Sequence, residues 1–399
     1  KRTAGLDVHR MSVVGTILIE LEDGTLREET RSFGAFRRDR RELCSWLKAE
    51  GVELAVMEST GIYWKSVFAS LERAGILTYV VNARHVKNVP GRKTDVKDSQ
   101  WLASLARMGL LKPSFIPPED LRELRLISRQ RSKIQGMLAA EKNRMNKVLD
   151  DAGIRLGAVV SDINGVSAQK MIDGLVEGRP VKELVKEARG RLKKKEPALA
   201  HCLDETPGER HRFLLRKIRD HIRYLEAELK ECDEYLFAAM EPYKRHWNVL
   251  RTIPGVDKLG AAILIVEIGV DMERFGSAQK LASWAGMCPG NNESAGKRRS
   301  GRARKGNQAV RRVLCEIANA ARRTRSQFMG KYKSLVIRRG HKRTIIALGH
   351  KILRVVFAVL KSESPYNDPE VDYEAIIVER NAPRWIRELQ KHGYLPGTA

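Results

Sequence analysis

The sequence predicts an N-terminal α/β domain followed by two mainly helical parts, on the strength of three observations. Short β-branched runs alternate with amphipathic stretches over roughly the first 110 residues. Two long stretches in the middle repeat apolar residues at intervals of three and four, which is typical of long helices. The last third alternates short helical patterns with Gly-rich, strongly basic segments. We therefore expect domains at 1–117, 118–247 and 248–362, with a polar insertion at 155–209 and a C-terminal tail at 363–399.

The composition restricts the class of protein. The 399 residues include 74 Lys and Arg against 49 Asp and Glu, a formal net charge of +25, and such an excess attracts polyanions, of which nucleic acid is the commonest. There is no apolar run long enough to span a bilayer and no signal-peptide pattern, so we expect no membrane association. The five Cys are far apart and form no CxxC motif, which argues against zinc ribbons and disulfide scaffolds and suits a reducing cytoplasm.

The sequence pattern of the N-terminal part predicts an order of strands and helices that is typical of ribonuclease H-like domains. Strands are expected at Ala4–Val8, Ser12–Leu21, Leu26–Phe33, Val52–Met57 and Leu77–Val81, and helices at Arg37–Glu50, Ile62–Ala74 and Thr94–Leu110. Asp23-Gly24 is the clearest turn signal between the second and third strands. Three antiparallel strands leading into α/β units are the expected arrangement of a ribonuclease H-like domain.

Four acidic residues stand at the ends of these elements. Asp7 ends the first strand, Glu58 ends the fourth, and Asp95 and Asp98 lie at the start of a helix with the spacing that shares one helix face. Four carboxylates at one edge repel each other unless a hard cation such as Mg²⁺ holds them, and a metal pair suits phosphodiester chemistry. Taken singly, each of these residues is more typical of a turn or a helix cap, but all four in this order of elements, in so basic a chain, favour the metal site.

The middle of the chain predicts two long helices, at Asp120–Ala152 and Arg210–Met240. They are expected to pair as an antiparallel coiled coil or to supply a dimer interface. The basic face of the first helix either contacts a phosphate backbone or is simply solvated.

The C-terminal third contains a candidate phosphate-binding turn. The segment Ile253–Leu264, with Gly255 in its turn, resembles a helix–hairpin–helix, in which backbone N–H groups at a helix N-terminus bind phosphate. Asp257 stands where that motif usually has a second Gly, so an ordinary helix start is the alternative interpretation.

The densest basic stretch follows, from Lys297 to Arg343, with 17 Lys and Arg against one acid, Glu316. We expect an exposed loop over Asn292–Asn307 and steeply salt-dependent binding of nucleic acid. The expected nucleic-acid contacts are Gly255, Lys297, Arg298, Arg299, Arg302, Arg304, Lys305, Asn307, Arg311 and Arg312. Ser294 and Ser300 lie in the expected loop as candidate nucleophiles beside the guanidinium groups, although the residues alone favour plain loop serines.

Several motifs in one order resemble the DEDD transposases of bacterial insertion sequences, the bridge-RNA-guided recombinase family. They are Gly5–His9, Met57–Gly61, Lys93–Asp98, Ile253–Gly255 and the Ser294 to Arg312 stretch, within a match from about Ala4 to about Leu360. The departures are Asp257, Ala295 after the candidate serine, and the insertion.

The resemblance implies a Holliday-junction-resolvase-like domain with Asp7, Glu58, Asp95 and Asp98 as Mg²⁺ ligands. It also implies a serine nucleophile. The position in the motif corresponds to Ser294, and Ser300 is the alternative. It further implies a non-coding bridge RNA that pairs with donor and target DNA, a homo-oligomer (dimer or tetramer) whose sites combine subunits, and a bacterial, cytoplasmic, nucleoid-associated protein.

The leading hypothesis is thus an RNA-guided DNA transposase/recombinase that uses a serine nucleophile and a Mg²⁺-binding carboxylate cluster. One alternative is a structure-specific, junction-resolving, Mg²⁺-dependent endonuclease without a covalent intermediate. The other is a non-catalytic scaffold that binds RNA and DNA.

Overall fold

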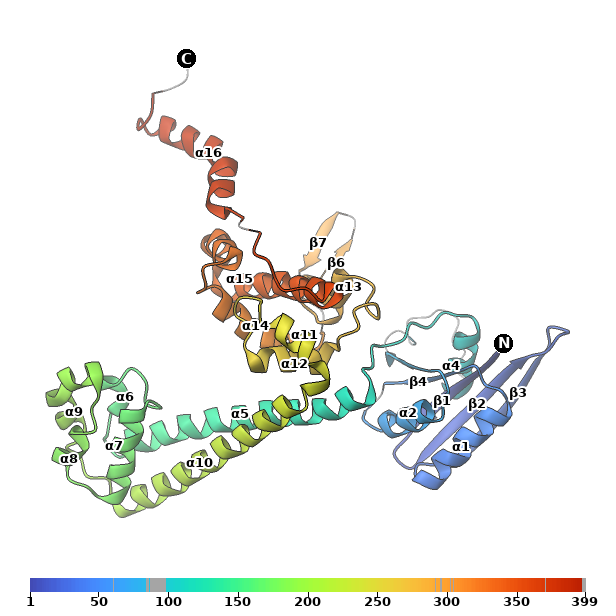
Figure 1. Cartoon of the computed structure of the whole chain (residues 1–399), viewed down its shortest axis with the longest axis horizontal. Coiled ribbons are helices and arrows are strands. Elements are labelled where there is room, and N and C mark those ends of the chain that lie inside the picture. The colour runs from blue at the N-terminus through green and yellow to red at the C-terminus, as the bar shows by residue number, and fades with distance from the viewer. Residues whose placement is uncertain are drawn as a thin grey trace. The chain divides into compact units, whose positions relative to one another are not determined.

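A computed structural model describes residues 1–59, 61–83, 86, 98–290, 292–294, 296–301, 303, 305–369 and 371–396. The chain divides into two compact units, residues 1–119 and residues 120–399 (Figure 1). Each unit is described by itself below. Among the described residues, no helix combines the length and the apolar character needed to cross a membrane.

The first unit is built on a five-stranded mixed sheet in the order β3-β2-β1-β4-β5. Its strands are β1 (Arg2–Val8), β2 (Ser12–Glu20), β3 (Leu26–Gly34), β4 (Leu54–Glu58) and β5 (Thr78–Val81). The first three are antiparallel neighbours, whereas β1, β4 and β5 run parallel. This arrangement confirms the ribonuclease H-like fold predicted from the order of elements.

Helices cover both faces of this sheet. Helices α1 (Arg37–Ala49) and α2 (Trp64–Arg73) pack on one face, where Leu43, Leu47 and Leu71 join a core with Leu6 and Met57. Helix α4 (Asp98–Arg107) packs on the other face, where Leu102 and Leu105 join Val56 and Val81. Since side chains alternate along a strand, the two cores use alternate residues of the same strands.

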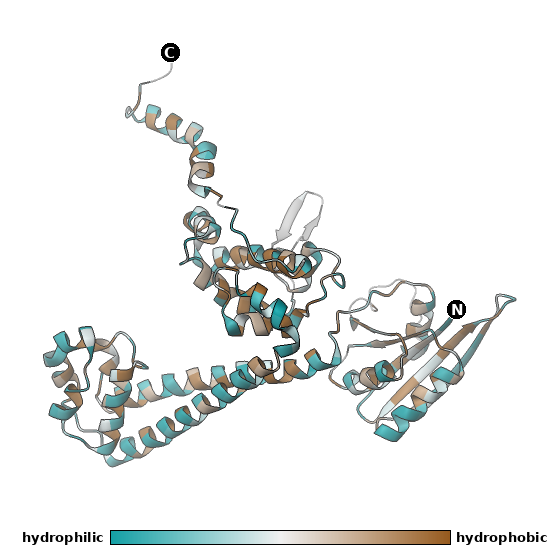
Figure 2. Ribbon diagram, in the orientation of Figure 1, coloured by the Kyte–Doolittle hydropathy of each residue, from teal (hydrophilic) through white to brown (hydrophobic). Residues whose placement is uncertain are grey.

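The second unit begins with two long helices, α5 (Glu119–Asp151) and α10 (Glu209–Ala238), which lie side by side and antiparallel (Figure 1). Lys142 Nζ lies 2.7 Å from Glu226 Oε1, and Arg131 pairs with Asp233, so the sequence numbers rise along one helix as they fall along the other. Apolar and polar segments alternate along both helices in Figure 2, as an amphipathic pattern requires. The predicted antiparallel pairing of these helices is therefore present.

The insertion between them is a small helical subdomain. It contains α6 (Leu156–Val159), α7 (Val166–Glu177), α8 (Val181–Val185), a 3₁₀ helix (Gly190–Lys195) and α9 (Glu196–Cys202). Met171, Ile172, Leu184 and Leu199 are fully buried in one core together with residues of α5 and α10. The insertion thus closes the far end of the helical pair.

The remainder of the second unit is mainly helical, as predicted. It contains a 3₁₀ turn (Glu241–Tyr243), α11 (Lys244–Leu250), α12 (Lys258–Ile268), α13 (Ala278–Trp284), β6 (Asn292–Ser294), β7 (Lys297–Ser300), α14 (Gln308–Ala321), α15 (Gln327–Ser362) and α16 (Tyr373–Lys391). Helix α12 is its centre, because every residue from Gly260 to Ile268 is buried. Helix α15 is broken at Gly340, whose φ of 70° and ψ of 166° are not helical.

The expected loop over Asn292–Asn307 differs in part from the structure. Strands β6 and β7 pair antiparallel there, Ser294 opposite Lys297, and the turn between them contains Gly296 with a φ of 73°. A glycine adopts this left-handed backbone without steric cost, and it favours a tight hairpin. The sequence-based expectation of a plain loop overlooked this turn signal.

Candidate functional site

The first candidate site lies at one edge of the ribonuclease H-like sheet. Strands β1 and β4 are parallel neighbours in which Leu6 pairs with Met57, so the next residues, Asp7 and Glu58, lie side by side. Leu6 and Met57 point into the core under α1 and α2. Because side chains alternate along strands, Asp7 and Glu58 both belong to the opposite face, which α4 covers. Two of the four predicted carboxylates are therefore neighbours.

Helix α4 brings Asp98 to the same edge. Ser99 Oγ lies 2.8 Å from Thr16 Oγ1, and Thr16 is the strand partner of Gly5. One turn later, the Ala103 carbonyl accepts a hydrogen bond from Thr3 Oγ1 at 3.2 Å. The helix therefore runs opposite to β1, and its first residue, Asp98, lies toward the Asp7 end of the strand.

The close approach of α4 depends on the absence of a side chain at Gly5. A Cβ atom at this position would lie 2.0 Å from the Ser99 carbonyl oxygen and 2.5 Å from the Ala103 nitrogen. Both contacts are to backbone atoms, which cannot rotate away. Gly5 therefore fixes how closely the helix that carries Asp98 lies against the strand that carries Asp7.

The donor atoms at this edge are of the kind that a hard cation prefers. All three described carboxylates offer oxygen ligands, which Mg²⁺ prefers, and Asp7 Oδ2 lies 3.0 Å from His9 Nε2, a contact that orients the carboxylate. Within the described ranges, however, no three His, Cys, Asp or Glu side chains form a group that could hold a metal ion. The fourth predicted ligand, Asp95, lies outside the described residues.

A second candidate site surrounds the β6–β7 hairpin of the other unit. Ser294 ends β6 and Ser300 ends β7, and Lys297, Arg298 and Arg299 lie on β7 between them. Arg302 and Arg304 lie outside the described residues. Lys305 and Arg312 are exposed, as groups that contact a phosphate backbone must be.

A positively charged cavity of about 790 Å³ adjoins this hairpin. Arg311 of α14 and Arg339, Lys342 and Arg343 of α15 line it together with Gly301, the residue after β7. Of these cations, only Arg311 was predicted as a contact. The other three belong to the same basic stretch of sequence, but nothing in the sequence showed that they and Arg311 line one cavity.

The cavity also contains a histidine that resists protonation. Burial, reinforced by the nearby Arg354, lowers the pKa of His350 below its usual value. On acidification the unfolded chain therefore takes up this proton before the folded chain does, so the stability contributed by a neutral His350 is present above about pH 6.5 and falls below it.

We accordingly expect the full chain to lose thermal stability between about pH 7 and pH 5, and His350→Gln to lose less over the same range. Melting temperatures measured across that range test the difference, with the exposed His392→Gln as the matched control. An unchanged pH dependence in His350→Gln would contradict this prediction.

The two ends of the hairpin segment are held together at its base. A Cβ atom on Gly306 would lie 2.3 Å from the Gly286 nitrogen and 2.4 Å from the Ala285 carbonyl carbon. The backbone that leaves the hairpin segment at Gly306 therefore lies directly against the backbone that enters it at Ala285 and Gly286. Asn307 follows at once and caps α14, its Oδ1 accepting from the Ala309 and Val310 nitrogens at 2.9 and 3.2 Å. Residues 286–306 thus form a closed loop that carries both candidate serines.

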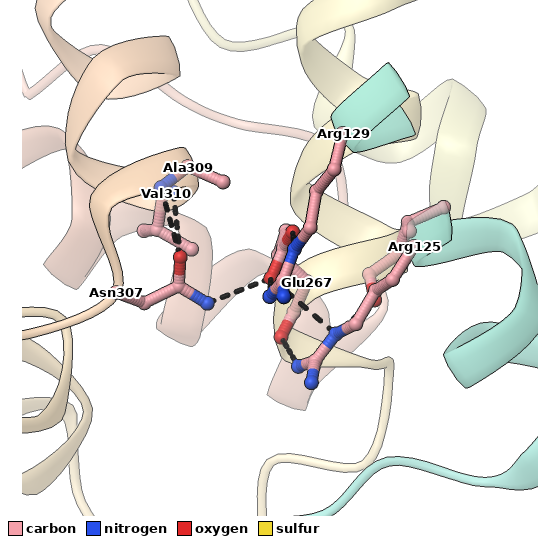
Figure 3. A network of polar contacts seen from close by, with 7 residues as sticks. Arg125, Arg129, Glu267, Asn307, Ala309 and Val310 are labelled. Atoms are coloured by element: carbon pink, nitrogen blue, oxygen red, sulfur yellow. Dashed lines mark hydrogen bonds and ion pairs between the residues drawn. The ribbon is translucent and has the colours of Figure 1, made fainter. Parts of the chain in front are cut away.

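A fully buried carboxylate anchors this base to the long helix α5 (Figure 3). Glu267 of α12, whose side chain is 0% exposed, accepts from Asn307 Nδ2 at 2.7 Å and from Arg129 through two bonds of 3.0 and 3.1 Å. Arg125 Nε lies 3.3 Å from the same carboxylate. Burial lowers the pKa of Arg125 to about 10, with Glu267 opposing that shift, so the arginine stays charged at neutral pH.

Sequence reasoning overlooked this network. Glu267 appeared as one acid within an apolar helix, a pattern that does signal a buried, partnered charge. Asn307 was predicted as a nucleic-acid contact, but both polar ends of its side chain have partners within the protein. Its contact with nucleic acid stays a prediction.

The predicted helix–hairpin–helix turn lies between α11 and α12. Asp257 accepts a hydrogen bond from the Gly260 nitrogen at 2.7 Å, so a carboxylate of the chain itself already caps this helix N-terminus. Gly255, with a φ of 88°, lies against α14, where a Cβ atom would be 2.6 Å from the Ala321 nitrogen. The structure thus gives Gly255 a packing role, and its phosphate contact stays a prediction.

We expect Gly255→Ala to destabilise the second unit by about 2–3 kcal/mol, since it combines a left-handed backbone with an overlap against α14. The control is Gly190→Ala, which also has a positive φ, 57°, but open space around the added carbon, so only a cost of about 1 kcal/mol is expected. Denaturant titration of both variants measures the difference, and equal losses would show that the contact with α14 contributes nothing.

Comparison with known proteins identifies the family of the chain. A family model described as "Transposase", the DEDD type, matches residues 4–154, and a second, described as "Transposase IS116/IS110/IS902 family", matches residues 247–333. The chain belongs to the DEDD transposase family of bacterial insertion sequences. It is therefore a DNA transposase, and the two matches contain the carboxylate edge and the hairpin, respectively.

Relatives of this transposase include two proteins of different description. The transposase for insertion sequence element IS1111A of Coxiella burnetii is 25% identical over 341 residues, which cover 83% of this chain and 84% of the relative. The pilin gene-inverting protein of Moraxella bovis is 28% identical over 155 residues, 37% of this chain and 48% of that protein. Among solved structures, RuvC of Thermus thermophilus aligns over all of its own chain and 29% of this one, with 15% identity and a TM-score of 0.23.

Proposed function

We propose that this transposase cleaves and rejoins DNA strands through the hydroxyl of Ser294, assisted by a Mg²⁺ site formed by Asp7, Glu58, Asp95 and Asp98. A non-coding bridge RNA selects donor and target DNA in this proposal. The active form is a homo-oligomer, a dimer or tetramer, in which the two sites meet.

The observation that carries this proposal is the carboxylate edge. Asp7, one residue before the end of β1, and Glu58, the last residue of β4, lie on one face of neighbouring parallel strands, and α4 begins on that face with Asp98. A bound Mg²⁺ pair supplies charge stabilisation for the oxygens of a reacting phosphodiester. The carboxylates of this chain would hold the ions, and His9 would orient Asp7 through the contact described above.

In the serine step, a phosphodiester bond of the DNA is exchanged for a phosphoserine bond, so the energy of the broken bond is kept in the covalent link. The Ser294 oxygen bonds to phosphorus while the bond from phosphorus to one strand oxygen breaks, and the serine proton passes to solvent or a nearby base as the strand oxygen takes up a proton. A hydroxyl end of the second DNA then attacks the phosphoserine and releases the serine, so that no external energy source is needed. The cations of the cavity beside the hairpin, Arg311 among them, hold the phosphate charge during the exchange.

The other parts receive supporting roles in this proposal. Helices α5 and α10 form a coiled-coil spacer within 118–247, the segment 248–362 forms the serine-bearing domain with its helix–hairpin–helix-like element, and 363–399 is a tail. The net charge of +25 supports binding of both nucleic acids.

The test is an assay for a covalent protein–DNA adduct. Full-length protein is incubated with Mg²⁺, bridge RNA and DNA containing the element ends, denatured, and examined for protein that stays attached to DNA. We expect an adduct in the wild type and in Ser300→Ala, and none in Ser294→Ala or Asp7→Asn.

The alternatives give different results in the same assay. Free cut ends that persist in Ser294→Ala without an adduct would favour a junction-resolving endonuclease that uses the carboxylates alone. DNA binding without cleavage at any Mg²⁺ concentration would leave a non-catalytic scaffold.

A further inference from the structure

The α1–α2 face of the first unit carries a basic groove that the proposed chemistry does not use. The groove, about 610 Å³ in volume, lies between α1 and α2 and is lined by Arg37, Arg40, Arg41, Lys48 and Arg73, together with Cys44, Ser45, Ser70 and Ala74. Among the described residues, its lining contains five cations and no acidic residue. We propose that this groove is a second DNA-binding surface, which holds the phosphate backbone of a duplex away from the site of cleavage.

Two of the cations are held by partners, and the other three are exposed. Arg40 Nε donates to Ser70 Oγ at 3.1 Å, which joins the two helices, and Arg73 pairs with Glu119. Arg37, Arg41 and Lys48 are exposed and follow one face of α1 at helical spacing. Their 11-residue span corresponds to about 16 Å along the helix, enough to reach several successive phosphates.

The lining identifies a duplex as the partner. Proteins that bind single strands stack the bases on aromatic side chains, and none of the lining residues that the structure describes is aromatic. A lining of cations and small polar groups instead suits contact with the sugar-phosphate backbone, which positions a duplex without reading its sequence. DNA is the substrate of a transposase, so the inference is a contact with duplex DNA.

The location of the groove separates this DNA from the reacting phosphate. Helices α1 and α2 pack on the sheet face that contains Leu6 and Met57. Asp7 and Glu58 belong to the opposite face, under α4. The groove therefore holds either a flank of the cut DNA or the second of the two duplexes that a recombinase must bring together.

The test compares two double variants of the full-length protein with matched charge loss. Arg41→Gln with Lys48→Gln removes an exposed arginine and lysine from the groove, whereas Arg38→Gln with Lys112→Gln removes the same pair of residue types from exposed positions outside its lining. Binding of a duplex DNA without element sequences is measured from about 50 to 200 mM salt.

We expect the groove variant to bind this DNA about tenfold more weakly at the lower salt. We also expect the slope of log affinity against log salt to fall by about 2, one unit for each lost phosphate contact. The control should match the wild type on both measures. Ser45→Cys, labelled with a photocrosslinker, should attach to the duplex, because Ser45 is exposed in the groove lining.

The outcomes are distinguishable from those of the adduct assay. Equal affinities and slopes in the two double variants, or crosslinks absent at position 45, would overturn the groove proposal even if Ser294 forms an adduct. A loss confined to double-stranded RNA would overturn it as well, since the groove would then serve the guide. Conversely, loss of duplex affinity in the groove variant stands even if the covalent step proves wrong.

Discussion

Gly5→Ala is expected to destabilise the first unit by about 3 kcal/mol or more and to abolish DNA cleavage. The added carbon would lie 2.0 Å from a backbone oxygen of α4 and 2.5 Å from a backbone nitrogen, so no side-chain rotation relieves the overlap. The helix must move away from β1 or the strand must distort. Either change would separate Asp98 from Asp7 and Glu58, so the proposed metal site would lose its geometry.

Denaturant unfolding and the cleavage assay measure the two effects of Gly5→Ala together. The control is Gly24→Ala in the β2–β3 turn, where no described atom lies within 4 Å of the added carbon and the expected cost comes from the positive φ of 79° alone. The control should lose about 1 kcal/mol and keep its activity. A Gly5→Ala protein with wild-type stability and cleavage would show that α4 does not lie against β1 as described.

Glu267→Gln has the second large expected effect, a loss of about 3 kcal/mol from the second unit. Removing one partner of a buried ion pair leaves the other charge uncompensated, at a typical cost of 3–5 kcal/mol. Here the Arg125 side chain, 15% exposed, would remain buried without its counter-charge. Glutamine keeps the shape and some of the hydrogen bonds, which places the loss near the lower end of that range.

The same substitution should also slow adduct formation in the molecules that remain folded. Glu267 accepts the hydrogen bond from Asn307, and Asn307 caps α14 at the point where the loop of residues 286–306 ends. Loosening that base moves the serines relative to Arg311. The control is Glu241→Gln, which removes an exposed pair with Lys244 and should cost less than about 0.5 kcal/mol.

A folded Glu267→Gln protein therefore provides the decisive comparison. Under conditions where circular dichroism shows it fully folded, it should bind DNA like the wild type and form the adduct at least tenfold more slowly. Equal adduct rates in the two proteins would mean that the network stabilises the fold without positioning the loop.

Local patterns in the sequence were sufficient to predict the elements of the first unit. The alternation in β2, the Asp23-Gly24 turn and the amphipathic pattern of α1 all depend on neighbours in the chain, and each element lies within a few residues of its expected position. The sequence also placed Asp7 and Glu58 near the ends of two strands at one edge of the sheet, but the pairing of those strands as parallel neighbours came from the structure.

Contacts between distant segments were not predictable in the same way. The role of Gly5 depends on Ser99 and Ala103, about a hundred residues away, and that of Glu267 depends on Arg129 and Asn307. Each of these residues is ordinary in its local context. The insertion illustrates the same limit of local patterns, since its polar, interrupted sequence concealed a core completed by α5 and α10.

The most direct test of the account is to identify the residue that carries the DNA after cleavage. Digestion of the denatured adduct after glutamate residues releases the peptide 294–316, which follows Glu293, ends at Glu316 and contains both candidate serines. Fragmentation by mass spectrometry then separates Ser294 from Ser300. We predict a nucleotide-phosphate group on Ser294. A nucleotide on any other residue, or cut DNA with no modified peptide, would contradict the account.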